Sequence, residues 1–131
     1  MRLIAHRANI NGRIKEKENR LEQIKFCISS GYDVEIDINV FNDQIYLGHD
    51  DIQQKISIDF LIEIQDKVWI HCKNLNALNY FNKSKYKFNY FWHQEDKYTL
   101  TSKGFIWTYP GSELCAGCIA VMPELTIKKE Q

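Results

Sequence analysis

The stretch that decides the fold is Val34-Glu35-Ile36-Asp37-Ile38-Asn39-Val40, in which branched aliphatic and polar residues alternate strictly. Successive side chains of a β-strand point to opposite faces, so a period of two predicts a strand with one apolar face toward a core. The turn residues Asn42-Asp43 follow, and a second strand-like run extends from Gln44 to His49. We therefore predict that the two segments form a β-hairpin.

A helix is predicted on the N-terminal side of this hairpin. A short buried strand at 2–6 and a polar loop at 8–18 come first. Asn19 is placed to cap the helix, with Glu22 three residues later as in a capping box. Gly31 is placed to end it, because glycine readily adopts the left-handed conformation that follows many helices.

Helices and strands also alternate on the C-terminal side. Ser57 and Asn74 are placed to cap two further helices. Four further strands are predicted, at 68–72, 89–92, 105–109 and 119–122. The alternation favours an α/β fold with a largely parallel sheet. The segment 94–104 is short for a helix that crosses between parallel strands, so the second half of such a fold would be reduced.

The composition is that of a globular domain with no excess charge. The chain has 131 residues, and its 17 basic residues balance its 17 acidic ones. A balanced charge argues against a nucleic-acid partner and against a polybasic membrane contact. No apolar run approaches the ~20 residues of a membrane span, and the first residues lack the apolar region of a signal peptide. We therefore expect a single cytoplasmic domain.

The four cysteines do not suggest a disulfide framework. Cys27 and Cys72 stand alone in apolar contexts, so we expect them to be small buried side chains. Cys115 and Cys118 form a lone C-x-x-C pair. Such a pair is a weak signal for a zinc or redox site, because zinc needs a second ligand pair and a redox pair normally opens a helix after a strand.

Glu35, Asp37 and Asn39 share the polar face of the central strand. A solvent-exposed sheet face would explain them without any function. In an α/β fold, however, both faces are normally covered. Two carboxylates about 6–7 Å apart on a covered face repel each other and need a cation, which is a metal, an arginine or a lysine. Oxygen ligands of this kind suit Mg²⁺ or Ca²⁺.

The histidines supply the second functional signal. All four, His6, His49, His71 and His93, fall at the C-terminal ends of predicted strands. In parallel α/β folds that edge of the sheet is where ligands bind. A single histidine is usually a hydrogen-bonded structural residue, but four at equivalent positions beside a carboxylate pair indicate a functional site.

These residues resemble the motifs of the glycerophosphodiester phosphodiesterase family, which are TIM-barrel enzymes related to phosphatidylinositol-specific phospholipase C. The resemblance covers roughly residues 2–75 and rests on four motifs in the same order: His6-Arg7, Glu18-Asn19, Glu35-x-Asp37 and His49-Asp50. It implies that the chain, over residues 1–131, is one truncated or minimal TIM-like (β/α) barrel of mostly parallel strands, whose C-terminal strands are missing.

The resemblance also implies a role for each site residue. His6 and His49 would form a general acid/base pair, and Arg7 and Lys73 would bind the phosphate. The metal ligands would be Glu35, Asp37 and His71. A phosphodiester is an anion, so its hydrolysis needs neutralising charge, a base for the nucleophile and an acid for the leaving alkoxide. The expected reaction is metal-dependent hydrolysis of a small glycerophosphodiester-like molecule.

Three departures from the family pattern leave an alternative open. Ala8 stands where the family has glycine, and His71 stands where it has a third metal-binding carboxylate. Because of this histidine, Mn²⁺ and Zn²⁺ are candidate metals beside Mg²⁺ and Ca²⁺. The chain is also far shorter than the ~250 residues of a typical TIM barrel. An open barrel would expose sheet edges and favour a homo-oligomer. The alternative is a catalytically degenerate barrel that binds a phosphorylated ligand without hydrolysing it, and a purely structural domain is a third reading.

Overall fold

The computed structural model describes residues 3–10, 18–49, 52–93, 98–109 and 118–120. Its elements follow one another along the chain as β1 (Ile4–His6), α1 (Leu21–Ser29), β2 (Asp33–Phe41), β3 (Gln44–Leu47), β4 (Gln54–Ile56), α2 (Ile58–Glu63), β5 (Val68–Cys72), α3 (Leu75–Lys83), β6 (Asn89–Phe91), β7 (Tyr98–Leu100), β8 (Ile106–Thr108) and β9 (Cys118–Ala120).

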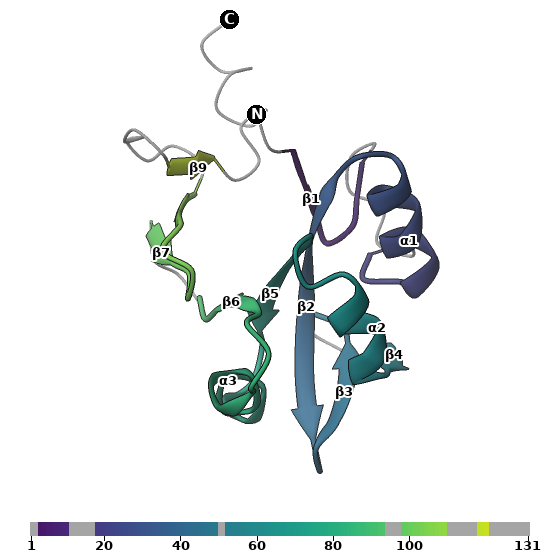
Figure 1. Ribbon diagram of the computed structural model, residues 1–131, viewed down its shortest axis with the longest axis vertical. Helices are drawn as coiled ribbons and strands as arrows, with labels where there is room; N and C mark the ends of the chain where they lie inside the picture. The colour runs from purple at the N-terminus through teal and green to yellow at the C-terminus, as the bar shows by residue number, and fades with distance from the viewer. Residues whose placement is uncertain (1–2, 11–17, 50–51, 94–97, 110–117, 121–131) are drawn as a thin grey trace, which may run out of the picture.

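The main sheet is built around β2, its longest strand (Figure 1). The strand order is β4-β3-β2-β5-β6, and β1 pairs with the first residues of β2 on the edge that β3 occupies farther along. Strands β1, β5 and β6 run parallel to β2, whereas β3 runs antiparallel to it and β4 antiparallel to β3. The predicted hairpin is confirmed, and its two turn residues, Asn42 and Asp43, both have positive φ angles of 50° and 60°, as a tight two-residue turn between twisted strands requires.

The three helices cover one face of this sheet. The apolar residues of β2, from Val34 to Val40, are at most 2% exposed and belong to one buried cluster. The helices contribute Ile24, Leu61 and Phe81 to the same cluster. The strict alternation in β2 therefore has the predicted consequence, since every second residue lies in the helix-covered core.

A small second sheet of β7, β8 and β9 packs, through β8, against the opposite face of β5 and β6. Trp69 of β5 and Phe91 of β6 form a second buried cluster with Trp107 of β8. The Trp69 and Trp107 rings have centroids 5.8 Å apart, and those of Phe91 and Trp107 are 4.8 Å apart. The polar side of β2 is on the same side of the sheet as Trp69, which stands opposite Glu35 in the strand register.

The prediction of a TIM-like barrel with mostly parallel strands is wrong. Within the described ranges the chain has three helices and two separate sheets, and no pairing joins β6 to β7 to close a ring. The sheets are also mixed, since β3, β4 and β7 make antiparallel pairs. The physical reason lies at the ends of the strand series: β2 has a parallel neighbour on each edge, β1 and β5, but within the described ranges β6 pairs with no strand other than β5, and β3 and β4 add antiparallel pairs on the other side.

The predicted helix caps and strands are confirmed in some places and wrong in others. Ser57 and Asn74 cap α2 and α3 as predicted, each accepting a backbone hydrogen bond from the third residue of its helix. The cap predicted at Asn19 is wrong, because α1 begins one residue later with Arg20 as its N-cap residue. Strands β4 and β7 do not correspond to any predicted strand. Gly31, with φ 92°, follows the end of α1 as expected.

The cysteine predictions are confirmed where the structure describes them. Cys27 and Cys72 are buried free thiols. Cys115 lies outside the described residues, and the side chain of Cys118 does too. None of the helices within the described ranges is both long and apolar enough to span a membrane.

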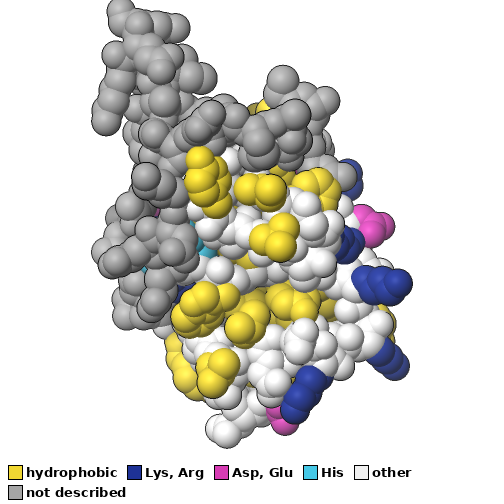
Figure 2. All heavy atoms as spheres, turned by 90° about the vertical axis from the view of Figure 1, so that its left-hand side faces the viewer, with side chains coloured by type: hydrophobic (Ala, Val, Ile, Leu, Met, Phe, Trp, Pro, Cys, Tyr) yellow, Lys and Arg dark blue, Asp and Glu magenta, His cyan; other side chains and the backbone are white. Residues whose placement is uncertain are grey.

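Apolar side chains gather on the side of the molecule that carries α3, β6 and β7 (Figure 2). Large exposed hydrophobic residues in and next to these elements include Leu75, Trp92, Tyr98 and Leu100. Trp92 is 41% exposed, whereas Trp69, Phe91 and Trp107 are buried.

Candidate metal and phosphate site

The strand register brings the predicted site residues together on one face of the main sheet. His6 on β1 stands opposite Glu35 on β2, and Asp37 on β2 stands opposite His71 on β5. Directly opposed residues on neighbouring strands lie side by side on the same face. His6 and His71 lie at or next to the C-terminal ends of the parallel strands β1 and β5, as expected. Glu35 and Asp37 lie beside those ends, in the first half of the longer strand β2, on the face turned away from the three helices.

Glu35, Asp37 and His71 form a compact triad. Each offers one ligand atom, and these atoms all lie within 4.8 Å of one another. The His71 Nδ1 atom is 3.0 Å from Asp37 Oδ1 and 3.8 Å from Glu35 Oε1. Both carboxylates are almost fully buried, at 1% and 0% exposure. The convergence of these three residues, predicted from strand parity and the family resemblance, is observed.

The triad has the donor set of a divalent-cation site. Glu35 Oε1 and Asp37 Oδ1 are buried oxygen atoms without a hydrogen-bond partner among the described residues. The Nε2 atom of His71 lies 3.1 Å from the carbonyl oxygen of His93. A carbonyl only accepts, so Nε2 carries a proton, and Nδ1 is the atom that can either donate to Asp37 Oδ1 or, without its own proton, bind a cation. When Nδ1 carries no proton, its lone pair and the two carboxylate oxygens face one point, which is unfavourable unless a cation lies there.

The two carboxyl groups titrate in opposite directions. Burial, together with the neighbouring Asp37 charge, raises the pKa of Glu35 well above 4.5. Burial alone would also raise the pKa of Asp37. The adjacent His71 ring, the Asn19 amide and the charge of Arg7 outweigh it and lower that pKa to about 2. Asp37 is therefore ionised without a cation, whereas the ionised form of Glu35 needs a cation nearby for its stability.

Asn19 and Arg7 hold Asp37 in place. The Asn19 amide donates to Asp37 Oδ2 at 2.9 Å and accepts from the Asp37 backbone N–H at 2.9 Å. The Arg7 Nε atom lies 3.3 Å from the same Oδ2 atom, and its Nη1 donates to Glu18 at 3.3 Å. Sequence reasoning assigned Asn19 to a helix cap; its left-handed backbone, with φ 53°, turns the side chain to the site instead.

The backbone after β1 is arranged to bring Arg7 over the carboxylates. Arg7 and Ala8 both have left-handed φ angles, 53° and 61°. This explains why glycine stands in the family pattern at the position of Ala8, since a residue without Cβ adopts that conformation without strain. Ala8 adopts it here, fully buried, and its carbonyl accepts a hydrogen bond from Cys27 Sγ. The Arg7 backbone N–H donates to Glu35 Oε2 at 3.1 Å.

The two predicted acid/base histidines border the same cavity as the triad. The cavity has a volume of about 490 Å³ and is lined on one side by polar residues, namely His6, Arg7, Glu35, His49, His71 and Lys73. The His6 Nε2 atom is 3.4 Å from Glu35 Oε2. Burial, together with the charge of Arg7, lowers the pKa of His6 to about 4, so it is neutral at neutral pH. The Lys73 Nζ atom lies 3.4 Å from His49 Nε2.

Aromatic residues from β6, β8 and their flanking loops line the other side of the cavity. Phe91 stacks on the His71 ring at 4.9 Å, and Tyr109 stacks on His93 at 3.8 Å. His93 Nδ1 also lies 2.9 Å from the Thr99 hydroxyl. Phe91 reaches the cavity because the register places it opposite His71, and Trp107 packs against Phe91. This arrangement depends on pairing and packing between distant segments, which a local sequence pattern does not show.

Comparison with known proteins identifies no relative. No family model, curated protein or solved structure matches the chain. The resemblance to glycerophosphodiester phosphodiesterases therefore stays a prediction that rests on the four motifs. The comparisons likewise give no support to a hydrolase activity, so any functional conclusion has to be argued from the site itself.

Proposed function

We propose that this protein binds a divalent cation at Glu35, Asp37 and His71 and hydrolyses a small phosphodiester in the adjoining cavity. One observation carries the proposal: three ligand atoms, from the buried carboxylates of Glu35 and Asp37 and from the His71 ring, all lie within 4.8 Å of one another. The same cavity is lined by two cationic side chains and, besides His71, by His6, His49 and His93. The choice of a glycerophosphodiester-like substrate comes from the motif resemblance.

The charge of the site supports an anionic substrate only when a cation is bound. Among the described residues, the carboxylates of Glu18 and Asp37 offset the two positive side chains, Arg7 and Lys73, and an ionised Glu35 would make the site negative. Without a cation the site therefore has no excess positive charge for a phosphodiester. A divalent cation would supply that charge and, when bound, would polarise the phosphoryl group toward attack. Two carboxylates and an imidazole are a ligand set that suits Mg²⁺ or Mn²⁺, whereas soft metal ions prefer sulfur ligands.

The two histidines are assigned complementary proton transfers. His6, whose pKa lies at about 4, is neutral at neutral pH and accepts the proton of the attacking hydroxyl or water. The Lys73 Nζ atom lies beside His49 Nε2, and His49 is assigned the proton that passes to the departing alkoxide. Lys73 itself compensates charge on the phosphoryl oxygens.

A second candidate function is binding without hydrolysis. It is favoured by the contacts of Arg7, whose guanidinium already lies 3.3 Å from both Glu18 and Asp37. An arginine occupied by two carboxylates contributes less to phosphate binding than a free one. In this case the protein would hold a phosphorylated molecule next to the cation and leave its ester bonds intact.

Hydrolysis of bis(p-nitrophenyl) phosphate and glycerophosphocholine, with Mg²⁺, Ca²⁺, Mn²⁺ or Zn²⁺ and after chelation, tests the proposal. Turnover that requires one of these metals and falls in Asp37→Asn supports it, with exposed Asp59→Asn as the matched control. Binding alone would show no turnover with any metal, yet glycerol phosphate would raise the melting temperature by mass action. Absence of both turnover and metal-induced stabilisation would reject the site altogether.

A further inference from the structure

A second cavity lies on the helix side of the main sheet, away from the triad. It has a volume of about 540 Å³ and is lined by the end of β2, the hairpin turn, α2, α3 and the loop after α3. Val40 belongs to its lining, and Val40 lies on the helix-covered face of β2, opposite the face that carries Glu35 and Asp37. Among the described residues, the cavity shares no lining residue with the metal and phosphate site.

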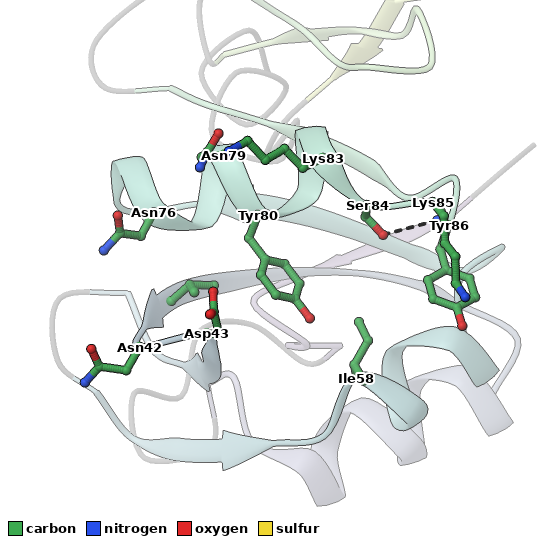
Figure 3. Close-up of a pocket in the computed structure, with 11 residues that line it drawn as sticks. Asn42, Asp43, Ile58, Asn76, Asn79, Tyr80, Lys83, Ser84, Lys85 and Tyr86 are labelled. Carbon is green, nitrogen blue, oxygen red and sulfur yellow. Dashed lines mark hydrogen bonds between the residues drawn. The ribbon is translucent and has the colours of Figure 1, made fainter.

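Helix α3 presents a polar stripe to this cavity. Asn76, Asn79, Tyr80 and Lys83 follow the spacing i, i+3, i+4 and i+7, which places them on one face of a helix. Such spacing normally belongs to apolar residues, and α3 does have a separate buried side with Ala77 and Phe81. In Figure 3, Tyr80 reaches from α3 into the space between α3 and α2, where Ile58 points toward it.

A neighbouring cavity of about 490 Å³ extends this space toward β4. The two share Asp43, Ile58 and Tyr80 and are therefore continuous. The second part adds Gln44 and Lys55 to the lining. We call the whole depression the α3–hairpin groove. Its hairpin wall is rigid, since the tight turn fixes Asn42 and Asp43 in left-handed conformations, and a preformed wall lowers the entropy lost on binding.

Several polar groups of the groove make no hydrogen bond within the described part of the chain. They are the exposed amides of Asn42, Asn76 and Asn79 and the hydroxyl of half-buried Tyr80, whereas the Ser84 hydroxyl accepts from the Tyr86 backbone N–H. Burial and the nearby Asp43 charge raise the pKa of Tyr80, so its hydroxyl remains a donor. Each amide offers a donor and an acceptor side by side, which matches a hydroxyl group, itself both donor and acceptor.

The charges of the groove add a second requirement for its ligand. Of the residues that the structure describes, three lysines, Lys55, Lys83 and Lys85, line it against a single carboxylate, that of Asp43. The Lys85 Nζ atom lies over one face of the Tyr86 ring, 5.3 Å from its centroid, so the Tyr80 ring and the remaining surface of Tyr86 provide flat apolar surface for C–H groups. A ligand that satisfies all three features has several hydroxyl groups on a compact carbon ring and carries a negative charge.

We propose that the α3–hairpin groove is a binding site for a hydroxylated organic anion, a sugar acid or a sugar phosphate. Amides meet the hydroxyl groups, the tyrosines contact the ring, and the lysines meet the anion. The two ligand types share this chemistry and differ only in whether a carboxylate or a phosphate carries the charge. The proposal is independent of the catalytic function, because the groove and the cation site have different described residues.

Amide chemical shifts of the ¹⁵N-labelled full chain report binding residue by residue. The probes are glucuronate, glucose 6-phosphate, neutral glucose and inorganic phosphate, each titrated with a chelator present so that the cation site is inactive. We expect saturable shifts at α3 and the hairpin turn for at least one of the two charged sugars, with a Kd of about 1 mM. The tighter of the two identifies the preferred anion.

Variants separate the parts of the groove. Asn79→Ala and Lys83→Gln are exposed substitutions that leave the buried side of α3 intact. Each should weaken binding by roughly fivefold or more, the value of one hydrogen bond or charge contact. Tyr80→Phe keeps the ring and removes only the donor. Exposed Lys67→Gln, outside the groove, is the matched control and should bind normally.

Three results would overturn the proposal. The first is no shift at the groove for either charged sugar at concentrations about tenfold above the expected Kd. The second is equal binding of inorganic phosphate and glucose 6-phosphate, which would mean that the hydroxyl groups make no contact. The third is unchanged affinity in both Asn79→Ala and Lys83→Gln while the folded spectrum is retained.

Discussion

Glu35 should lower the stability of the cation-free protein while being required for cation binding. Its side chain is 1% exposed, and its ligand oxygen lies within 4.8 Å of that of Asp37. Two unit charges at that separation repel by about 3.5 kcal/mol at an effective dielectric constant of about 20. Arg7 and Lys73 offset part of this repulsion. We expect Glu35→Gln to stabilise the chelated protein by about 1–3 kcal/mol.

The pH dependence of this effect follows from the direction of the pKa shift. The pKa of Glu35 is raised in the folded state, so its contribution to stability is complete below the ordinary value of 4.5 and is lost as pH rises through the raised value. The stability gap between Glu35→Gln and the wild type should therefore widen from pH 4.5 upward. Urea unfolding in the presence of a chelator measures it at each pH.

Asp37→Asn provides the control of opposite sign. The pKa of Asp37 is lowered to about 2, so its charge stabilises the fold above pH 3.8 and that contribution is lost as pH falls toward 2. Removing the charge should destabilise the chelated protein by about 1–3 kcal/mol. Adding Mn²⁺ should stabilise the wild type more than it stabilises Glu35→Gln or Asp37→Asn. The reasoning is refuted if Glu35→Gln is less stable than the wild type under chelation at pH 7.

Further expectations concern positioning, catalysis and thiol reactivity. Asn19→Ala removes two hydrogen bonds to Asp37 and should weaken Mn²⁺ binding about tenfold or more, measured by calorimetry, whereas exposed Asn82→Ala should not. If hydrolysis is found, His49→Ala should lower kcat by 10²–10⁴-fold, roughly, with an unchanged circular dichroism spectrum; unaltered kcat would remove His49 from the mechanism. Burial raises the pKa of Cys27 to about 11 and that of Cys72 to about 12. Mass spectrometry of the folded protein should therefore find both thiols largely unlabelled by iodoacetamide at pH 8, and labelled after unfolding.

The alternation within β2 is sufficient to predict the side on which each of its residues lies. It separates Val34 and Ile36 from Glu35 and Asp37, because side-chain direction in a strand depends only on its local period. The same local reasoning correctly predicts the hairpin and the caps at Ser57 and Asn74. Together with the family resemblance, it also selects the three residues whose ligand atoms converge.

Tertiary structure decided how these elements are arranged. The barrel prediction failed because the direction and order of strands depend on pairing between distant segments: β3 and β4 add antiparallel pairs beside β2, and among the described residues β6 pairs only with β5. Asn19 does not cap α1 as predicted; its side chain makes a hydrogen bond with Asp37, 18 residues away in sequence. Local patterns determine the face on which a side chain lies, whereas register and pairing between distant segments determine what it meets there.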